Sequence, residues 1–171
     1  MKAGSTKTAP AQAGERAVVI VESGIFVNCS VYDAHLVIST PSWISRAHPQ
    51  VVAARGLTHR PLERGEGWTE VYDFEGQMFS VDWQVRTARQ GKSWSVQTGQ
   101  FGWRGVQAAV NTNLQAVDGG TRILRRSKVA FGAGHQECES LRRQAGDVAV
   151  ASRYLANVKY TLEHRFVSAS G

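Results

Sequence analysis

Residues 106–131 read VQAAVNTNLQAVDGGTRILRRSKVAF and contain the clearest hairpin signal in the chain. Apolar and polar residues alternate along Val106–Val117, which is the period of a β-strand. Asp118-Gly119-Gly120 follows, and such a turn sequence is typical of a tight β-hairpin. Thr121–Phe131 then forms the second strand. The stretch predicts two long antiparallel strands joined by a short turn.

The same alternation of apolar and polar residues, interrupted by turn sequences, extends upstream to residue 50. Its clearest strand is Met78–Thr87, where Phe79, Val81, Trp83 and Val85 alternate with polar residues. Turn signals separate the segments, so we expect an antiparallel meander with one dry face and one wet face. The expected strands are Val51–His59, Gly67–Phe74, Met78–Thr87, Ser93–Phe101, Val106–Val117 and Thr121–Phe131.

A strand and two short helices are expected before the meander. The β-branched segment Val18–Asn28 predicts the strand. Ser30 suits the N-cap of a helix over Val31–Ser39. Pro41 opens a second helix, Ser42–Ala47, because proline is tolerated at a first helical position.

A long helical tract, Gln136–Phe166, is expected after the meander, since apolar residues recur there at helical spacing. Gly146-Asp147 is a point where this tract kinks or restarts, because glycine is weak inside a helix and aspartate is a good cap. The fold class is therefore α+β: a strand, two short helices, six further strands and a long helix.

Length and composition limit the domain count and the class of protein. The chain has 171 residues, 42% of them hydrophobic, which fits one domain with a real core. We expect a flexible tail at 1–16, one domain at 17–166 and a short tail at 167–171. No apolar run approaches the roughly 20 residues of a membrane span, and the start of the chain lacks the apolar core of a signal peptide. We therefore expect a cytoplasmic protein.

This order of elements resembles the helix-grip fold of the START-like or Bet v 1-like superfamily, with its polyketide cyclase/dehydrase and lipid-transport group. The landmarks are Trp43 in the second short helix and the sequence DGGTRI at 118–123, which is similar to the family's hairpin before its last strand. The resemblance covers roughly residues 17–166 and depends on the order and spacing of the landmarks.

The resemblance implies a curved, seven-stranded antiparallel sheet wrapped around the long C-terminal helix, with a cavity between them. It also implies a bacterial protein whose ligand is a lipid, a polyketide or another mostly apolar molecule, bound without a cofactor. Some members catalyse cyclisation or dehydration in the cavity. The superfamily shares no catalytic motif, so the resemblance assigns no catalytic residue.

Strand alternation predicts which side chains face the interior. We expect the wall of the cavity to combine aromatic, aliphatic and a few polar side chains from the strands with two residues from the helices. These candidates are Trp43, Trp68, Tyr72, Trp83, Trp94, Val110, Thr112, Arg125, Ser127 and Leu155. The aromatic members either pack as ordinary core or form a flat surface for a ring-containing ligand.

Two charged residues fall on the inward parity. Glu70 shares a face with Trp68 and Tyr72, and Arg125 shares one with Ile123. Because a buried charge is costly unless it is paired or solvated, they either neutralise each other or form the polar end of the cavity. In the second case Arg125 would bind a ligand oxygen.

Glu70, Arg125 and His48 are the candidates for catalysis. His48 ends the second short helix and could transfer a proton near neutral pH, or it is simply a surface residue at a helix end. Arg125 could stabilise an enolate in a cyclase or dehydratase. The main alternatives are thus a binding module and an enzyme on the same scaffold.

The net charge of +6 raises a third alternative, an interaction protein with a basic outer face. Arg122, Arg126 and Lys128 lie on the outward parity of the last strand. Acidic residues are interleaved along the chain, and no aromatic–basic recognition motif occurs, which disfavours nucleic acid as a partner. The histidine spacing also gives no metal site. A homodimer remains open.

Overall fold

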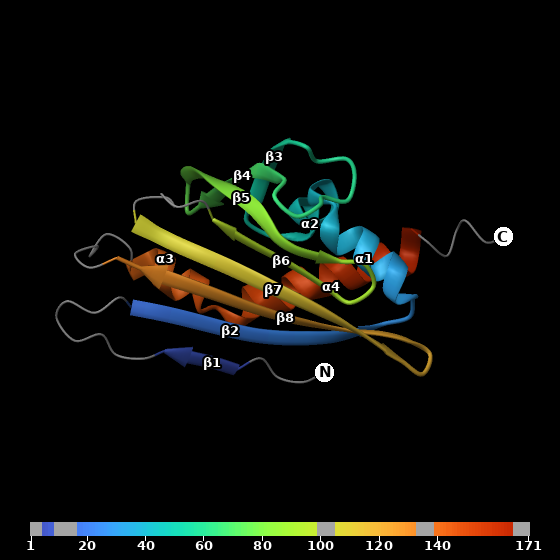
Figure 1. Cartoon of the computed structure of the whole chain (residues 1–171). Coiled ribbons are helices and arrows are strands. Elements are labelled where there is room, and N and C mark those ends of the chain that lie inside the picture. The colour runs from blue at the N-terminus through green and yellow to red at the C-terminus, as the bar shows by residue number, and fades with distance from the viewer. Residues whose placement is uncertain (1–4, 9–16, 99–104, 133–138, 166–171) are drawn as a thin grey trace.

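The computed structural model describes residues 5–8, 17–98, 105–132 and 139–165. Eight antiparallel strands form one curved sheet in the order β1-β2-β8-β7-β6-β5-β4-β3 (Figure 1). The strands are β1 (Ser5–Thr8), β2 (Ala17–Val27), β3 (Val51–Gly56), β4 (Gly67–Phe74), β5 (Gln77–Arg89), β6 (Ser93–Thr98), β7 (Val106–Val117) and β8 (Gly120–Phe131). The helices are α1 (Val31–Ser39), α2 (Pro41–Ala47), α3 (Glu139–Ala145) and α4 (Val148–Arg165).

The seven expected strands are all present, and their order confirms the meander. β1 is an eighth strand, in a segment where we predicted only a tail, and it pairs with β2 through Thr6 and Val21. The sequence of β1, STKT, has no apolar alternation that would have indicated it. Residues 99–101, at the end of the expected strand Ser93–Phe101, lie outside the described residues.

The two short helices lie between β2 and β3, as expected. Ser30 caps α1, since its hydroxyl accepts a hydrogen bond from the Asp33 N–H at 3.1 Å. Thr40 ends α1 and precedes Pro41, the first residue of α2. The chain therefore turns sharply enough for α1 and α2 to close one end of the sheet (Figure 1).

The C-terminal helical tract is divided where the sequence suggested. α3 ends at Ala145 and α4 begins at Val148, so Gly146 and Asp147 interrupt it. The Asp147 carboxylate accepts a hydrogen bond from the Ala149 N–H at 2.7 Å and so caps α4. Both helices lie against the inner face of the sheet (Figure 1). Residues 136–138 of the predicted tract lie outside the described residues.

The core fills the space between α4, α1 and the sheet. Val158 and Leu162 of α4 are fully buried there, together with Val27 of β2 and Ile123 of β8. Trp68, Trp83 and Trp94 pack into the same cluster. Helix α4 thus presents its apolar stripe to the inner parity of the strands, as the alternation predicts.

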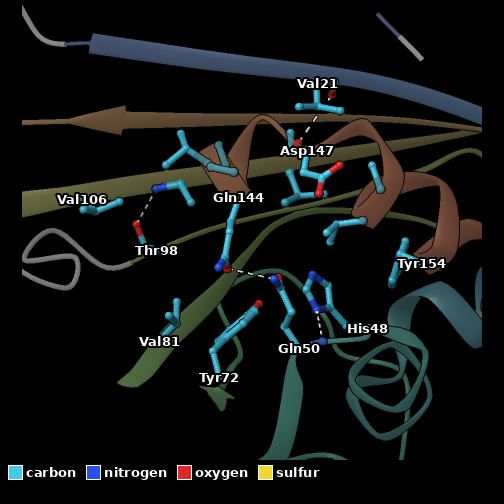
Figure 2. Close-up of a pocket in the computed structure, with 18 of the residues that line it drawn as sticks. Val21, His48, Gln50, Tyr72, Val81, Thr98, Val106, Gln144, Asp147 and Tyr154 are labelled. Carbon is cyan, nitrogen blue, oxygen red and sulfur yellow. Dashed lines mark hydrogen bonds between the residues drawn. The ribbon is translucent and has the colours of Figure 1, made fainter. Parts of the chain in front are cut away.

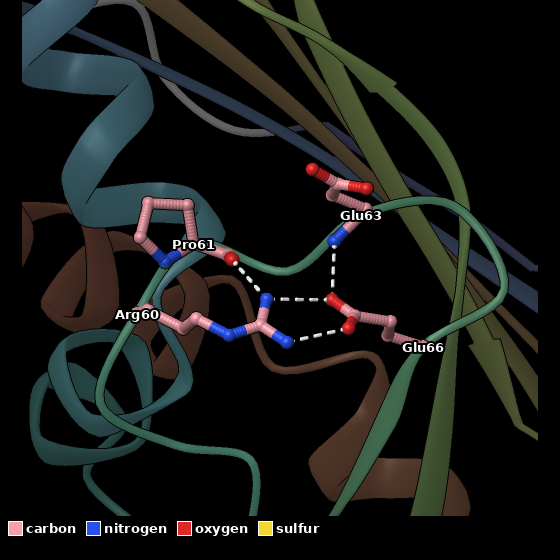
Figure 3. Close-up of polar contacts among 4 residues, drawn as sticks. All are labelled: Arg60, Pro61, Glu63 and Glu66. Carbon is pink, nitrogen blue, oxygen red and sulfur yellow. Dashed lines mark hydrogen bonds and ion pairs between the residues drawn. The ribbon is translucent and has the colours of Figure 1, made fainter.

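Polar contacts hold the loop between β3 and β4 in place (Figure 3). Arg60 forms a two-pronged ion pair with Glu66, and Glu66 also accepts the Glu63 N–H at 2.8 Å. These hydrogen bonds, first that from Arg60, lower the pKa of Glu66 to about 2. Leu62, in the middle of the loop, is buried against the core. The loop is therefore anchored both by its polar ends and by one apolar side chain.

Candidate functional site

A cavity of about 150 Å³ lies between the sheet and the helices α3 and α4 (Figure 2). Its wall is mostly apolar, and the main contributors are Val81, Val106, Ala108, Val110, Val129 and Ala151. A cavity of this size with an apolar lining is large enough for one benzene ring. It lies toward the α3 end of the sheet, away from α1.

Small side chains on facing elements create the space. Ala108 on β7 lies opposite Val129 on β8, and Ala151 of α4 lines the same cavity. Larger side chains at 108 and 151 would fill the volume between sheet and helix, because packed interiors leave few voids. The alternation of β7 places Val106, Ala108 and Val110 in the cavity wall, and Val110 was among the predicted wall residues.

One end of the cavity is polar. Arg125, Tyr154, His48 and Tyr72 meet there, and we call these four residues the polar corner. The Arg125 guanidinium carbon lies 4.8 Å from the centre of the Tyr154 ring. The His48 ring centre lies 5.9 Å from that of Tyr154 and 5.3 Å from that of Tyr72. The corner is therefore a continuous contact network.

His48 lies at the C-terminal end of α2, as expected, and it also lies in the cavity wall, so it is more than a surface residue at a helix end. Its Nδ1 accepts the Gln50 N–H at 3.3 Å (Figure 2). Burial, and secondly the positive charge of Arg125, lower the pKa of His48 to about 3. The imidazole is thus neutral at physiological pH, and since Nδ1 accepts, Nε2 carries the hydrogen as a donor.

This buried histidine predicts an acid-sensitive fold. Its folded pKa lies below the unfolded value of 6.5, so the unfolded chain binds the proton first. Stability is complete above pH 6.5 and falls as the pH decreases toward 3, by up to about 1.4 kcal/mol per pH unit. We expect His48→Gln to reduce this slope in denaturant titrations between pH 6.5 and 4.

The control is His59→Gln, because His59 is exposed in the β3–β4 loop. Burial also lowers the pKa of His35, which adds to the acid loss in both variants. An unchanged slope in His48→Gln would show that His48 is not held neutral by the fold.

Glu70 points inward, as predicted, but lies behind the cavity and does not line it. It is 5% exposed and accepts three hydrogen bonds. Ser45 Oγ donates at 2.6 Å, Tyr72 Oη at 2.6 Å and Trp83 Nε1 at 2.9 Å. Among the described residues no ion pair joins Glu70 to Arg125. The carboxylate therefore holds neighbouring side chains of the protein together, and its predicted contact with a ligand is not supported.

The two tyrosines of the polar corner keep their protons at neutral pH. Burial, and then the charge of Glu70, raise the pKa of Tyr72 well above its usual value. Burial raises the pKa of Tyr154 to about 12, although the nearby Arg125 opposes the shift. Neither phenol is therefore suited to act as a base.

Arg125 lies on the inner face and lines the cavity, as the parity of β8 predicts. Within the described residues, its guanidinium has no hydrogen-bond acceptor and no carboxylate partner. It lies instead over the ring of Tyr154 in a cation–π contact. Ser127, two residues along the same face, donates to the Val21 carbonyl at 3.5 Å and also lines the cavity. The cavity wall thus contains a guanidinium whose N–H groups are available to a ligand.

Several predicted wall residues lie elsewhere. Of the candidates, Tyr72, Trp83, Val110, Arg125, Ser127 and His48 line the cavity, whereas Trp43, Trp68, Trp94, Thr112 and Leu155 do not. Trp68 and Trp94 stack with ring centres 5.7 Å apart in the core near α1. Their inward parity was right, but parity does not tell how far along the strand the cavity extends.

The rim of the cavity and Tyr154 were not predicted from the sequence. Gln50 Nε2 donates to Gln144 Oε1 at 2.9 Å and joins the β3 side to the end of α3 (Figure 2). Asp147 and Gln144 line the rim. Tyr154 lies next to Leu155, a predicted wall residue. Its aromatic side chain was the sequence signal that could have suggested a place in the wall.

Other features of the sequence have no counterpart in the cavity. Arg122, Arg126 and Lys128 are exposed on the outer face, and Arg126 pairs with Glu22 at 3.4 Å. In the described part of the chain, no His, Cys, Asp and Glu cluster is arranged to hold a metal ion. No helix in the same residues is long and apolar enough to span a membrane.

Comparison with known proteins supports the architecture. No family model matches the chain, and no curated protein sequence matches it. Solved structures do. A START superfamily protein from Mycobacterium smegmatis is similar at 11% identity and a TM-score of 0.64, covering 84% of this chain and 97% of its own. The crystal structure of Ara h 8.0201 is similar at 13% identity and a TM-score of 0.60, covering 86% of this chain and 99% of its own.

The di-domain ARO/CYC StfQ from the steffimycin biosynthetic pathway is also similar, with 14% identity and a TM-score of 0.67. The match covers 86% of this chain and 52% of StfQ. At these identities the likeness concerns the fold. It confirms a START/Bet v 1-like helix-grip fold for this chain.

Proposed function

We propose that this chain, a protein with the START/Bet v 1-like helix-grip fold, binds a mostly apolar, ring-containing or acyl small molecule in the cavity between sheet and C-terminal helices. The observation that carries the proposal is an apolar cavity of about 150 Å³ with one guanidinium, Arg125, at its polar corner. Binding sites typically combine an apolar wall with a few convergent polar groups.

The protonation states favour binding over proton transfer. An efficient general acid or base has a pKa near the working pH. His48, with a pKa of about 3, and Tyr154, with one of about 12, lie far from neutrality on either side. These groups can donate hydrogen bonds to a ligand, whereas they exchange protons poorly at pH 7.

The proposal predicts that filling the cavity abolishes binding. In Ala108→Trp the indole would occupy the space opposite Val129, so we expect at least a tenfold loss of affinity for a single-ring apolar probe such as benzene, measured by calorimetry. Gln107→Trp is the control, because Gln107 is exposed on the outer face of the same strand. Circular dichroism verifies that both variants fold, since overpacking costs about 1–3 kcal/mol.

Equal probe affinity in the two tryptophan variants would contradict the proposed site. Native mass spectrometry of freshly purified protein adds an independent observation. A co-purified small molecule that is present in Gln107→Trp and absent from Ala108→Trp would place a natural ligand in the cavity.

A second candidate is a polyketide-type cyclase or dehydratase acting in the same cavity. The polar corner favours it, because Arg125 could stabilise an enolate oxygen while His48 donates a hydrogen bond. StfQ, a di-domain ARO/CYC, has a similar fold. Turnover of a candidate polyketide that is lost in Arg125→Ala would support the enzyme. Binding without product across the candidates would favour a carrier.

The cellular context is also a proposal. A cytoplasmic location, bacterial origin, a role in lipid transport and a homodimer remain predictions from the sequence and its resemblance. Size-exclusion chromatography with light scattering would measure the oligomeric state directly.

A further inference from the structure

The unpartnered cation in the cavity points to the charge of the ligand. Arg125 lies in a mostly apolar wall, and a partly buried guanidinium is costly unless an anion neutralises it. Glu70 is the nearby buried carboxylate, but Ser45, Tyr72 and Trp83 already occupy its oxygens. A ligand anion can supply the partner that the described residues do not.

The polar corner carries one positive charge, which matches a ligand with a single negative charge. His48 is neutral because burial lowers its pKa, so Arg125 is the one cation of the polar corner. Asp147, which caps α4, contributes a carboxylate to the cavity wall. An anionic group is therefore attracted toward Arg125 and repelled by Asp147, which favours placing the charged end of the ligand at the polar corner.

Two hydrogen-bond donors of the polar corner lie beside the Tyr154 ring. The Arg125 guanidinium carbon lies 4.8 Å from the centre of that ring, and the centre of the His48 ring lies 5.9 Å from it. His48 presents an Nε2 donor because its Nδ1 accepts from Gln50. A planar carboxylate suits this arrangement, since arginine binds its two oxygens through a planar fork.

The remaining wall indicates an aromatic ring rather than a flexible chain. Tyr72, Phe74 and Phe79 line the cavity with their rings stacked, and the Tyr72 and Phe79 planes differ by 9°. A cluster of aromatic side chains in a cavity wall favours contact with another ring, offset or edge to face. The volume of about 150 Å³ matches a ligand of about one ring.

Resting on the proposed function, we propose that the ligand is a compact aromatic acid: a single ring with one carboxylate, bound by Arg125 and His48 and packed against the aromatic wall. The test compares benzoate with benzamide, which has the same shape and no charge. Calorimetry on the full chain measures both, together with 2-naphthoate as a two-ring acid and hexanoate as an acyl acid.

We expect benzoate to bind about 10- to 100-fold more tightly than benzamide, because charge-assisted hydrogen bonds exceed neutral ones by that range. Arg125→Gln should remove this difference, and Arg125→Lys should keep part of it. Arg126→Gln is the control, since Arg126 is the next residue of the strand and points outward. 2-Naphthoate and hexanoate should both bind at least tenfold more weakly than benzoate.

Three results would overturn the inference while the proposed function stands: equal binding of benzoate and benzamide, tighter binding of 2-naphthoate, or tighter binding of hexanoate. A charge preference that is also lost in Arg126→Gln would overturn the assignment to Arg125. The proposed function itself fails in a different way, when no apolar probe distinguishes Ala108→Trp from Gln107→Trp.

Discussion

Glu70→Ala is expected to lower the free energy of unfolding by about 4 kcal/mol, because it leaves three buried donors without an acceptor. Ser45 belongs to α2, whereas Tyr72 and Trp83 belong to β4 and β5. The carboxylate therefore joins a helix to two strands, and its loss should loosen the whole wall behind the cavity. Denaturant unfolding followed by tryptophan fluorescence measures the change.

Glu70→Gln separates the hydrogen bonds from the charge. The amide keeps one acceptor oxygen but turns an N–H₂ group toward the donors, so we expect a loss of about 2 kcal/mol. Glu63→Ala is the control, because Glu63 is exposed and its removal should change stability by no more than about 0.5 kcal/mol. A loss below about 1 kcal/mol in Glu70→Ala would contradict a structural role for the network.

Gly120→Ala is expected to cost more than about 3 kcal/mol, since the new methyl group has no space. A Cβ at position 120 would overlap the carbonyl oxygen of Val27 and lie 3.0 Å from the ring of Phe26. Val27 is backbone-paired with Thr121 at the start of β8, so that end of the β2–β8 ladder would have to move. Thermal and denaturant unfolding both measure the loss.

The neighbouring glycine provides the matched comparison. Gly119 has φ = +78°, a conformation that favours glycine, but a Cβ there would meet nothing within 4 Å. Gly119→Ala should therefore cost only about 1 kcal/mol, from backbone conformation alone. If the two alanine variants lost the same stability, the clash at Gly120 would not be the dominant effect.

Side-chain alternation predicted the faces of the sheet well, for a simple physical reason. Successive residues of a strand point to opposite sides, so the inward positions of Arg125 and Glu70 followed from their neighbours alone. The same rule placed Arg126 outside. The helix break at Gly146 was also predicted, because glycine and a capping aspartate act locally on the backbone.

Distance along a strand could not be predicted in this way. Trp68 and Trp94 have the same parity as cavity residues, yet they pack beneath α1, because the curvature of the sheet and the position of the helices determine where space remains. Whether Glu70 pairs with Arg125 or with other donors likewise depends on the registers of β4, β5 and β8. Those registers arise from the whole sheet rather than from any short motif.

The rim residues Gln50 and Gln144 illustrate a further limit. They lie 94 positions apart in the chain, and a single glutamine gives no local signal of its partner. β1 is similar, since a short polar edge strand is held by main-chain hydrogen bonds that any side chain permits. Contacts of this kind become visible only in three dimensions.

Part of the cavity wall belongs to a small apolar cluster that is separate from the core around Trp68 and Trp94, and this separation has an evolutionary consequence. Substitutions at Val106 or Val129, which belong to the small cluster, would reshape the lining with little effect on the stacked Trp68 and Trp94. Most mutations are purged because they destabilise, so a lining that is insulated from the main core can change more freely. The fold can thus acquire a new ligand specificity through few mutations that leave its stability largely unchanged.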